Sequence, residues 1–239
     1  MLFSILQGDS IQSIIISLLL TVPVVIFALC VHETAHGYIA YKCGDSTAYN
    51  LGRLTLNPAR HLDLFGTLAM IVFGFGWAKP VPINTRNFKN PKRDMALSAA
   101  AGPAANLIMG LISAVLFGFT AAWNAYAEIT SPTGIWFTVS FWVMQFMWAS
   151  ALLNFVFAFF NLIPVPPFDG SRIALAFLPT KAYFGIMRHE REIMFGILIL
   201  MLVLSQFGIS PFSWLAEWII YKIANPVYGL GIDLFISLL

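Results

Sequence analysis

Residues 11–42 read IQSIIISLLLTVPVVIFALCVHETAHGYIAYK, and this stretch decides the fold. The run Ser10–Val31 contains no charged residue and is long enough to cross the hydrocarbon core of a bilayer, which takes roughly 20 apolar residues. Gly44 and Asp45 favour a helix end shortly after Lys42. We therefore predict one helix over about Ile11–Lys42. No basic residue precedes it, so we expect the helix to be retained and not cleaved as a secretory signal.

The composition of the whole chain is typical of a membrane protein. Of the 239 residues, 59% are hydrophobic and 10% are charged, whereas soluble domains usually contain about 25% charged residues. Four uncharged runs are long enough to span a membrane: Ser10–Val31, Met95–Ala127, Ile129–Phe168 and Ile193–Ala216. The sequence predicts an all-α polytopic membrane protein, embedded in a lipid bilayer, with about four to six transmembrane helices.

The charged residues are few and unevenly distributed. The net charge of +2 is too small and too scattered for a nucleic-acid-binding surface. Eight of the thirteen Lys and Arg residues lie between Lys42 and Arg93, four lie between Arg172 and Arg191, and none lies between Tyr126 and Trp136. By the positive-inside rule, both basic stretches face the cytoplasm. We therefore expect a multi-pass protein of the cell membrane with its N-terminus outside.

The segment between the first two spans differs from them in composition. Thr47–Ile83 is rich in Gly, Pro, Asn and β-branched residues, which favours short strands and turns. Within it, Leu64–Ala78 is apolar but only 15 residues long, with basic residues on both sides, so we expect it to be re-entrant or interfacial. We predict a short β-hairpin or re-entrant segment within residues 44–93, on the cytoplasmic side of a single domain over 1–239.

The end of the chain leaves two alternatives open. Phe212–Ile223 contains two Trp and one Lys among apolar residues. This pattern is typical of a helix that lies in the membrane interface and also of the end of a membrane span. We expect residues 212–239 to form an interfacial or a spanning tail.

The segment His32-Glu-Thr-Ala-His36 combines the residue types of a catalytic metal centre. A spacing of four residues places both imidazoles on one face of a helix, where they can bind a single metal ion. Glu33 then lies beside the metal and can take a proton from water during hydrolysis. Two buried structural histidines are the alternative, but two His and a Glu within an apolar membrane helix are costly without a function.

A catalytic zinc site normally has three protein ligands and an open position, so a third ligand is needed. The best candidate is Asp169, near the end of Asn161-Leu-Ile-Pro-Val-Pro-Pro-Phe-Asp-Gly170. The three prolines exclude a continuous helix, and irregular backbone at membrane depth is tolerated where it lines a cavity. Asp169 is also well suited to capping the helix that follows, and both roles are compatible. The first and third spans both run inward, so all three side chains are expected on the cytoplasmic side.

Two asparagines extend the candidate site. Asn106 ends the segment Gly102-Pro-Ala-Ala-Asn106, whose small residues allow helices to approach closely. Asn161 begins the proline-rich segment. Buried amides need hydrogen-bond partners, and either side chain could hold the substrate backbone or stabilise an oxyanion. We therefore include Asn106 and Asn161 with Glu33 as candidate catalytic residues, whereas for His61 we expect a polar surface or gating role outside the metal site.

These motifs resemble those of the site-2 protease family of intramembrane zinc metalloproteases. The resemblance covers roughly Val22 to Phe177 and rests on four segments: His32–His36, Asn57-Pro-Ala-Arg-His61, Gly102–Asn106 and Asn161–Gly170. It implies a zinc metalloendopeptidase in which His32, His36 and Asp169 hold one zinc ion per chain, Glu33 activates water and Asn161 assists the reacting carbonyl. The expected form is minimal, without a PDZ or nucleotide-sensing domain.

The resemblance also implies that the partners are substrate helices of other membrane proteins, cut at or near the membrane. We expect a locally unwound substrate to lie beside a strand from Lys79–Asn84, which would supply partners for its backbone. Two other functions use the same residues. The protein would then be a membrane transporter for metal or other ions through the His and Asp cluster, or an inactive scaffold that binds membrane helices. The substrate and the oligomeric state are not predicted.

Overall fold

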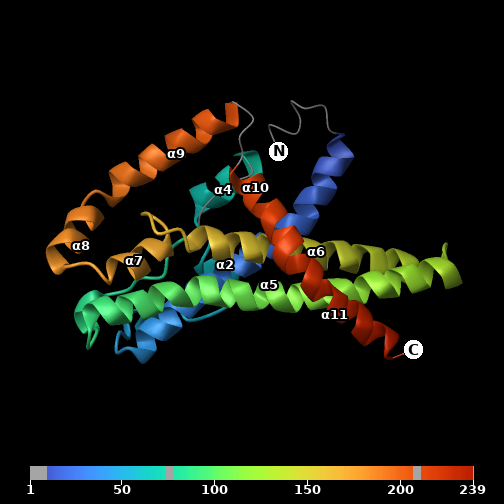
Figure 1. Ribbon diagram of the computed structural model, residues 1–239, viewed down its shortest axis with the longest axis horizontal. Coiled ribbons are helices and arrows are strands. Elements are labelled where there is room, and N and C mark those ends of the chain that lie inside the picture. Colours follow the sequence, from blue (N-terminus) through green and yellow to red (C-terminus); the bar gives the residue numbers. More distant parts are fainter. Residues whose placement is uncertain (1–9, 74–77, 207–210, 239) are drawn as a thin grey trace.

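The computed structural model describes residues 10–73, 78–206 and 211–238, and all regular secondary structure within these ranges is helical (Figure 1). Four helical stretches are long and apolar enough to cross a membrane: Ile11–Lys42, Pro91–Thr130, Ile135–Asn161 and Trp214–Ile236. The first three are helices α2, α5 and α6. The predicted all-α membrane fold is therefore confirmed, with four candidate spans among the described residues.

Helix α2 (Ile11–Lys42) has the predicted bounds, and each end has a local cause. Ser10 caps the N-terminus because its hydroxyl accepts a hydrogen bond from the Ser13 N–H. After the C-cap residue Cys43, Gly44 adopts a φ of +110°, which residues with a side chain rarely adopt. With 32 residues, α2 is about 48 Å long and extends beyond a hydrocarbon core of about 30 Å.

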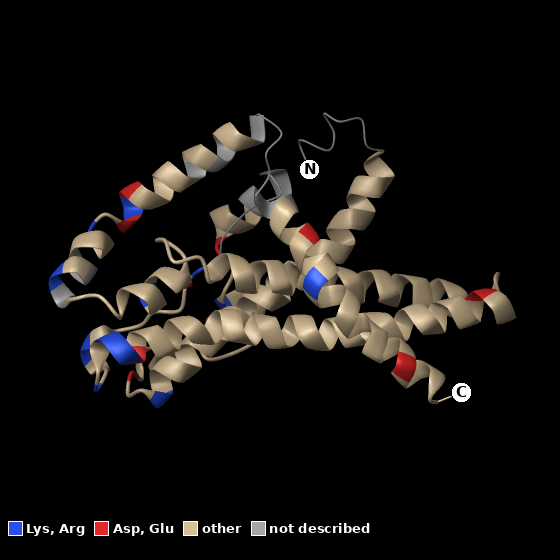
Figure 2. Cartoon of the chain, viewed as in Figure 1, with Lys and Arg blue, Asp and Glu red and all other residues tan. Residues whose placement is uncertain are grey.

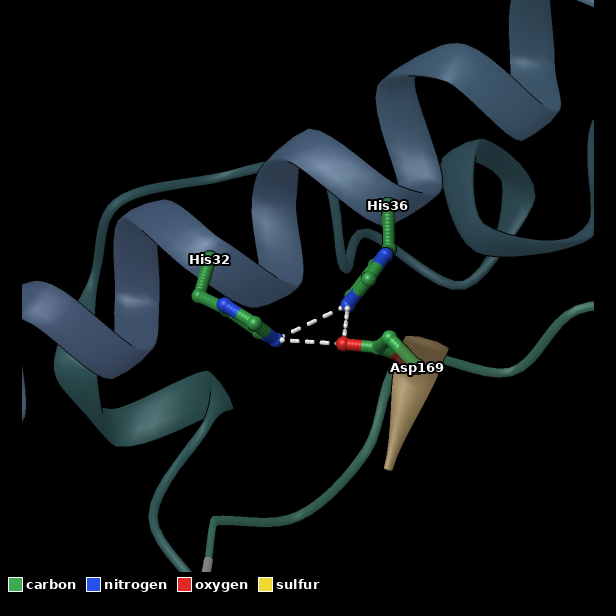
Figure 3. Close-up of side chains that lie close together, drawn as sticks. All are labelled: His32, His36 and Asp169. Atoms are coloured by element: carbon green, nitrogen blue, oxygen red, sulfur yellow. Dashed lines mark hydrogen bonds and ion pairs between the residues drawn. The ribbon is translucent and has the colours of Figure 1, made fainter. Parts of the chain in front are cut away.

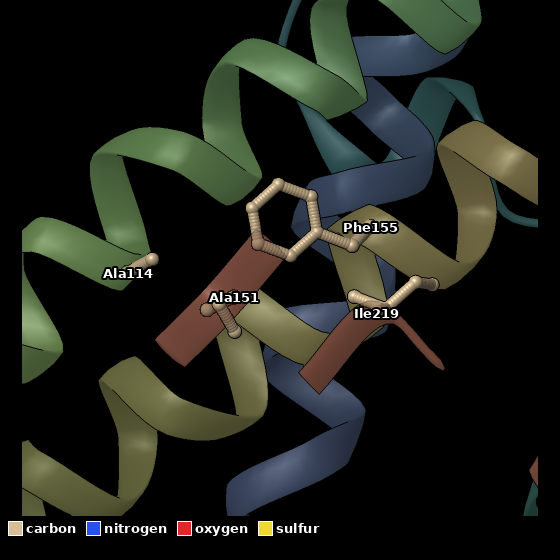
Figure 4. Packing of buried hydrophobic residues seen from close by; sticks show 5 residues of the cluster. Ala114, Ala151, Phe155 and Ile219 are labelled. Carbon is tan, nitrogen blue, oxygen red and sulfur yellow. The ribbon is translucent and has the colours of Figure 1, made fainter. Parts of the chain in front are cut away.

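The bundle is organised around α5 (Pro91–Thr130), which packs against α2, against α6 (Ile135–Asn161) and against α11 (Asn225–Ile236) (Figure 1). Phe155 of α6 is fully buried in a cluster with Ala114, Ala151 and Ile219 (Figure 4). A Cβ atom on Gly110 of α5 would overlap the ring of Phe155. A residue without a side chain at this position therefore gives the aromatic ring its space.

The β-hairpin predicted between the first two spans is wrong for the part of the chain that the structure describes. Residues 44–93 contain four short helices instead: α3 (Thr47–Asn50), η1 (Pro58–Arg60), α4 (Leu64–Phe73) and η2 (Thr85–Asn87). Only an isolated antiparallel bridge joins Leu62 to Ala78. Asn57 and Asn84 cap η1 and η2 through their side-chain oxygens.

Helix α4 occupies most of the apolar run that was predicted to be re-entrant or interfacial. Its 10 residues are too few to cross a bilayer. Asp63 begins it, because the Asp63 carboxylate accepts a hydrogen bond from the Gly66 N–H at 2.9 Å. Residues 74–77 of the predicted run lie outside the described residues, and its relation to the membrane stays a prediction.

The C-terminal third differs from the predicted spans. Helix α9 (Glu190–Gln206) has 17 residues, and residues 207–210 of the run Ile193–Ala216 lie outside the described residues. Helix α9 and the preceding α8 (Thr180–Met187) lie apart from the long helices (Figure 1). Beyond them, α10 (Pro211–Ile219), the π-helical η3 (Ile220–Ala224) and α11 follow one another without a break, so Trp214–Ile236 has the length and apolarity of a span.

The basic residues gather at one end of the bundle. Figure 2 shows most Lys and Arg residues around the end where α5 begins. Lys42 ends α2, and Lys92 and Arg93 lie in the first turn of α5. The connection between α5 and α6 at the opposite end has no basic residue. The predicted orientation depends on this unequal distribution of basic residues between the two ends of the bundle.

Asp45 ties the end of α2 to the segment that follows the short helices. Its carboxylate is fully buried and accepts hydrogen bonds from the Asn84 N–H and the Asn87 side-chain amide, each at 2.7 Å, and also from Thr47. Burial alone would raise the pKa of Asp45. The hydrogen bonds favour the ionised form and lower the pKa below its usual value.

We expect Asp45→Asn to destabilise the protein by about 1–3 kcal/mol at neutral pH. Because the pKa of Asp45 is lower in the folded state, its contribution is complete above the unfolded-state pKa of about 3.9 and is lost as the pH falls through the folded-state pKa. The stability difference between wild type and variant should therefore shrink only below about pH 4. Thermal unfolding in detergent at several pH values measures it. Asp233→Asn, at an exposed carboxylate, is the control; a difference that is independent of pH would contradict the assignment.

Candidate metal centre

Three of the predicted site residues meet at one point between α2 and the start of α7 (Asp169–Leu175) (Figure 3). Their atoms are close together: His32 Nε2 and His36 Nε2 are 2.9 Å apart, and Asp169 Oδ2 lies 3.1 Å from each of them. Among the residues that the structure describes, no other group of His, Cys, Asp and Glu converges in this way. The sequence argument that brought Asp169 to the paired imidazoles therefore agrees with the geometry.

The proline-rich connection after α6 brings Asp169 to α2. Helix α6 ends at Asn161, and α7 begins at Asp169 with Phe168 as its N-cap residue. Asp169 therefore lies in the first turn of α7, where a carboxylate is favoured by the helix dipole while it also faces the histidines. A Cβ atom on Gly170 would overlap the Leu162 carbonyl, so the connection can fold back this tightly only with glycine after the aspartate.

The rings of both histidines are fixed by acceptors on their outer nitrogens. His32 Nδ1 lies 2.5 Å from Asn106 Oδ1. The Asn106 side-chain N–H groups donate to the Ala28 carbonyl and to Asn154 Oδ1, so Asn106 Oδ1 is the acceptor for His32. His36 Nδ1 donates to the Ser98 carbonyl at 2.7 Å. Each Nδ1 therefore carries its hydrogen, and each Nε2 directs a lone pair to the common point.

This donor set fits a divalent metal ion. Two imidazole lone pairs and a carboxylate oxygen at about 3 Å from one another repel unless a positive charge lies among them. Two histidines and one carboxylate are also a ligand set of catalytic zinc sites. The outer hydrogen bonds from each Nδ1 correspond to the contacts that orient histidine ligands in metal sites. The residues present are therefore able to hold zinc.

The three side chains border a cavity of about 220 Å³, which is large enough for several water molecules. Glu33 lines it as well, and its Oε2 accepts a hydrogen bond of 2.7 Å from the Val81 N–H. The complete lining is His32, Glu33, His36, Pro80, Val81, Ile83, Met95, Ala99, Asn161, Pro167, Asp169 and Arg172. A carboxylate, the candidate metal ligands and a side-chain amide therefore share one partly apolar cavity.

The two candidate asparagines occupy different places. Asn161 lines the cavity and donates one side-chain N–H to the Phe157 carbonyl at 3.0 Å. Asn106 is fully buried, lies outside the cavity lining, and contacts the ring of His32. Its partner Asn154, which was missed, is also fully buried. The signal that could have found Asn154 is an amide in the middle of an uncharged run.

The structure corrects the expectation for His61 and shows a second buried side chain, Arg53, that the sequence did not single out. The expected surface position of His61 is wrong, because this side chain is only 1% exposed. His61 Nε2 donates to the Thr55 carbonyl at 2.6 Å, and His61 lies outside the metal cluster. Arg53 is buried as well and donates to the Lys79 carbonyl at 2.8 Å. A buried arginine in a loop has no simple sequence signal, because loop arginines are usually exposed.

Residues 20–205 match the peptidase family M50. The chain is 44% identical over 154 residues to "Putative zinc metalloprotease YwhC" of Bacillus subtilis, a match that covers 64% of this chain and 67% of the relative. It is 29% identical over 150 residues to "Putative zinc metalloprotease Rip2" of Mycolicibacterium smegmatis, a match that covers 61% of this chain and about half, 52%, of that relative. No solved structure matches the chain.

Gly102 of α5 provides a test of the metal centre. A Cβ atom at this position would lie 2.7 Å from Cε1 of His32 and would also overlap the ring of His36. We expect Gly102→Ala to displace both rings and to weaken zinc binding by about 10-fold to 100-fold, as measured by chelator competition and elemental analysis. The control is Gly229→Ala, because a Cβ atom on Gly229 meets open space. Wild-type zinc affinity in Gly102→Ala would contradict this assignment.

Proposed function

Since this chain belongs to peptidase family M50, the site-2 protease family that its motifs resemble, we propose that it is an intramembrane zinc metalloprotease. It hydrolyses peptide bonds in or near the transmembrane helices of other membrane proteins. The observation that carries the proposal is the convergence of two imidazoles and one carboxylate on a cavity that Glu33 also lines. His32, Glu33 and His36 lie in α2, which is long enough to span a bilayer. Asp169 begins α7, which follows α6, another helix of that length.

His32, His36 and Asp169 are the proposed ligands of one zinc ion per chain. The free Nε2 atoms and their distances from Asp169 support this assignment, and both curated relatives carry zinc in their names. When bound, zinc supplies a Lewis acid that promotes ionisation of water and polarises the peptide carbonyl. The protein supplies the remaining chemistry.

Glu33 is the proposed general base. It takes a proton from the attacking water and returns it to the leaving amine. Asn161 is proposed to donate a hydrogen bond to the reacting carbonyl oxygen as negative charge develops. One of its two N–H groups donates to the Phe157 carbonyl, and the second has no partner among the residues that the structure describes. Asn106 holds the ring of His32 in this scheme and orients a ligand without touching the substrate.

The Lys79–Asn84 segment is the proposed substrate-binding edge. Val81 and Ile83 line the cavity. Within the described ranges, the Val81 carbonyl and the Ile83 N–H have no intramolecular hydrogen-bond partner. A substrate helix that unwinds locally would have backbone groups without partners in the membrane, and pairing with these two groups would satisfy some of them.

The proposed orientation places the N-terminus outside and the active site near the cytoplasmic surface of the cell membrane. The basic end of the bundle supports it (Figure 2). His32 precedes Lys42 by ten residues, which corresponds to about 15 Å along a helix. The reacting atoms would then lie below the cytoplasmic headgroups, where a membrane helix and water can both reach them.

The proposal predicts different results for two single substitutions. Glu33→Gln should retain about one zinc ion per chain and lose cleavage by about 100-fold or more, because the ligands remain and the base is removed. Asp169→Ala should lose both zinc and cleavage. Elemental analysis of purified protein in detergent, with cleavage of a generic membrane-helix substrate, measures both. Glu128→Gln, an exposed change at the far end of α5, is the control.

Each rival function predicts a different result, which a second assay of the same proteins measures. A transporter would move zinc into liposomes with Glu33→Gln as well as with wild type. A scaffold would capture membrane helices after zinc removal and would never cut them. Full cleavage activity in Glu33→Gln would remove the general-base role.

A further inference from the structure

Arg53 contacts none of the proposed zinc ligands, yet it holds the segment that contacts Glu33. Its side chain is 8% exposed, and Nη2 donates to two successive carbonyls, those of Lys79 at 2.8 Å and Pro80 at 3.2 Å. The N–H of the next residue, Val81, donates to Glu33 Oε2 at 2.7 Å. A buried cation is therefore connected to the proposed general base through one short piece of backbone.

His61 holds the same segment where it begins, at Lys79. The His61 carbonyl accepts a hydrogen bond from the Lys79 N–H at 2.7 Å, and its Nε2 donates to the Thr55 carbonyl at 2.6 Å. That carbonyl also accepts a hydrogen bond of 2.8 Å from Thr34 Oγ1. Thr34 follows Glu33 in α2. The loop residues are therefore anchored to the helix turn that carries the proposed base.

We propose that Arg53 and His61 are positioning residues that aim the Val81 N–H at the Glu33 carboxylate. The inference rests on the proposed function, in which Glu33 transfers the proton. With Oε2 held by Val81, the carboxylate keeps one orientation. Its Oε1 has no hydrogen-bond partner among the described residues and is left for the water. A base that is misplaced by about 1 Å can lose about 100-fold in rate, so fixing this carboxylate has a direct effect on catalysis.

The flanking prolines make the Val81 N–H a single, specific donor. Pro80 and Pro82 have no N–H, so Val81 supplies the only backbone donor between Lys79 and Ile83. The Arg53 guanidinium donates to the Lys79 and Pro80 carbonyls, which precede the Val81 N–H along the backbone. Hydrogen bonds from a cation are stronger than those between neutral groups. The arrangement therefore restricts one peptide unit and directs its donor to Glu33.

Hydrogen–deuterium exchange tests the geometry without any cleavage assay. Residues 79–83 contain three exchangeable backbone amides, those of Lys79, Val81 and Ile83. The first two are hydrogen-bonded and should exchange slowly, and the third should exchange fast. Glu33→Ala should convert one slow amide to a fast one. Arg53→Met should do the same, and Arg53→Lys should restore part of the protection, in zinc-free and zinc-loaded protein alike. An unchanged pattern in Arg53→Met would overturn the proposal.

Cleavage kinetics test the effect on the base. Val81→Pro removes the N–H, and we expect kcat to fall by about 10-fold to 100-fold with KM and zinc content within about twofold of wild type. Val81→Ala keeps the N–H and should retain a kcat at least about tenfold above that of Val81→Pro. Arg53→Met should lower kcat as well, and Arg53→Lys should recover part of the loss. Arg60→Met, an exposed arginine in η1, is the matched control and should leave kcat unchanged.

The double variant Arg53→Met with Val81→Pro separates positioning from general stability. If Arg53 acts through the Val81 N–H, the double variant should be no slower than Val81→Pro alone. Additive losses, or a wild-type kcat in Val81→Pro, would overturn the proposal. If wild type cleaves no membrane-helix substrate while the exchange pattern is as expected, the proposed function fails and the hydrogen-bonded positioning stands.

Discussion

The constraint on which this structure depends is the mutual repulsion of three electron-pair donors inside a membrane bundle. Two imidazole nitrogens lie 2.9 Å apart and share a carboxylate oxygen at 3.1 Å, so separate contacts must hold each group in place. Asn106 and the Ser98 carbonyl fix the rings. The proline-rich connection returns the carboxylate to α2. The shape of the bundle around the site therefore follows from the need to hold groups together that would otherwise separate.

Local signals were sufficient to predict the helices but not the segment between them. The bounds of α2 followed from the uncharged run that starts at Ser10 and from Gly44 and Asp45 beyond Lys42; Ser10 and Gly44 each act within one turn of the chain. The expected β-hairpin failed because the Gly, Pro and Asn residues on which it rested are as compatible with short capped helices as with strands and turns; Asn57, for example, caps η1. Which of the two occurs depends on packing between distant segments, and no short window of sequence contains that information.

The site could be predicted as far as chemistry requires particular residue types. Two histidines and a carboxylate had to meet if a metal was to be bound, and the predicted direction of the spans placed Asp169 at the same end of the bundle as the histidines. Residue type alone did not distinguish Asn161 from Asn106, because the side of a helix that faces a cavity depends on how that helix is rotated in the bundle. The burial of Arg53 likewise depends on tertiary contacts, so the sequence did not single out this arginine.

The prolines beside Val81 also reduce the number of backbone groups through which copies of this protein could pair and aggregate. An unpaired backbone edge is a template on which a neighbouring chain can build a sheet, and membranes hold proteins at high local concentration. Between Lys79 and Asn84, two residues have no N–H, and only the Ile83 N–H has no partner within the described part of the chain. So short an edge disfavours pairing with another copy, whereas the proposed pairing with one extended substrate needs only these few groups.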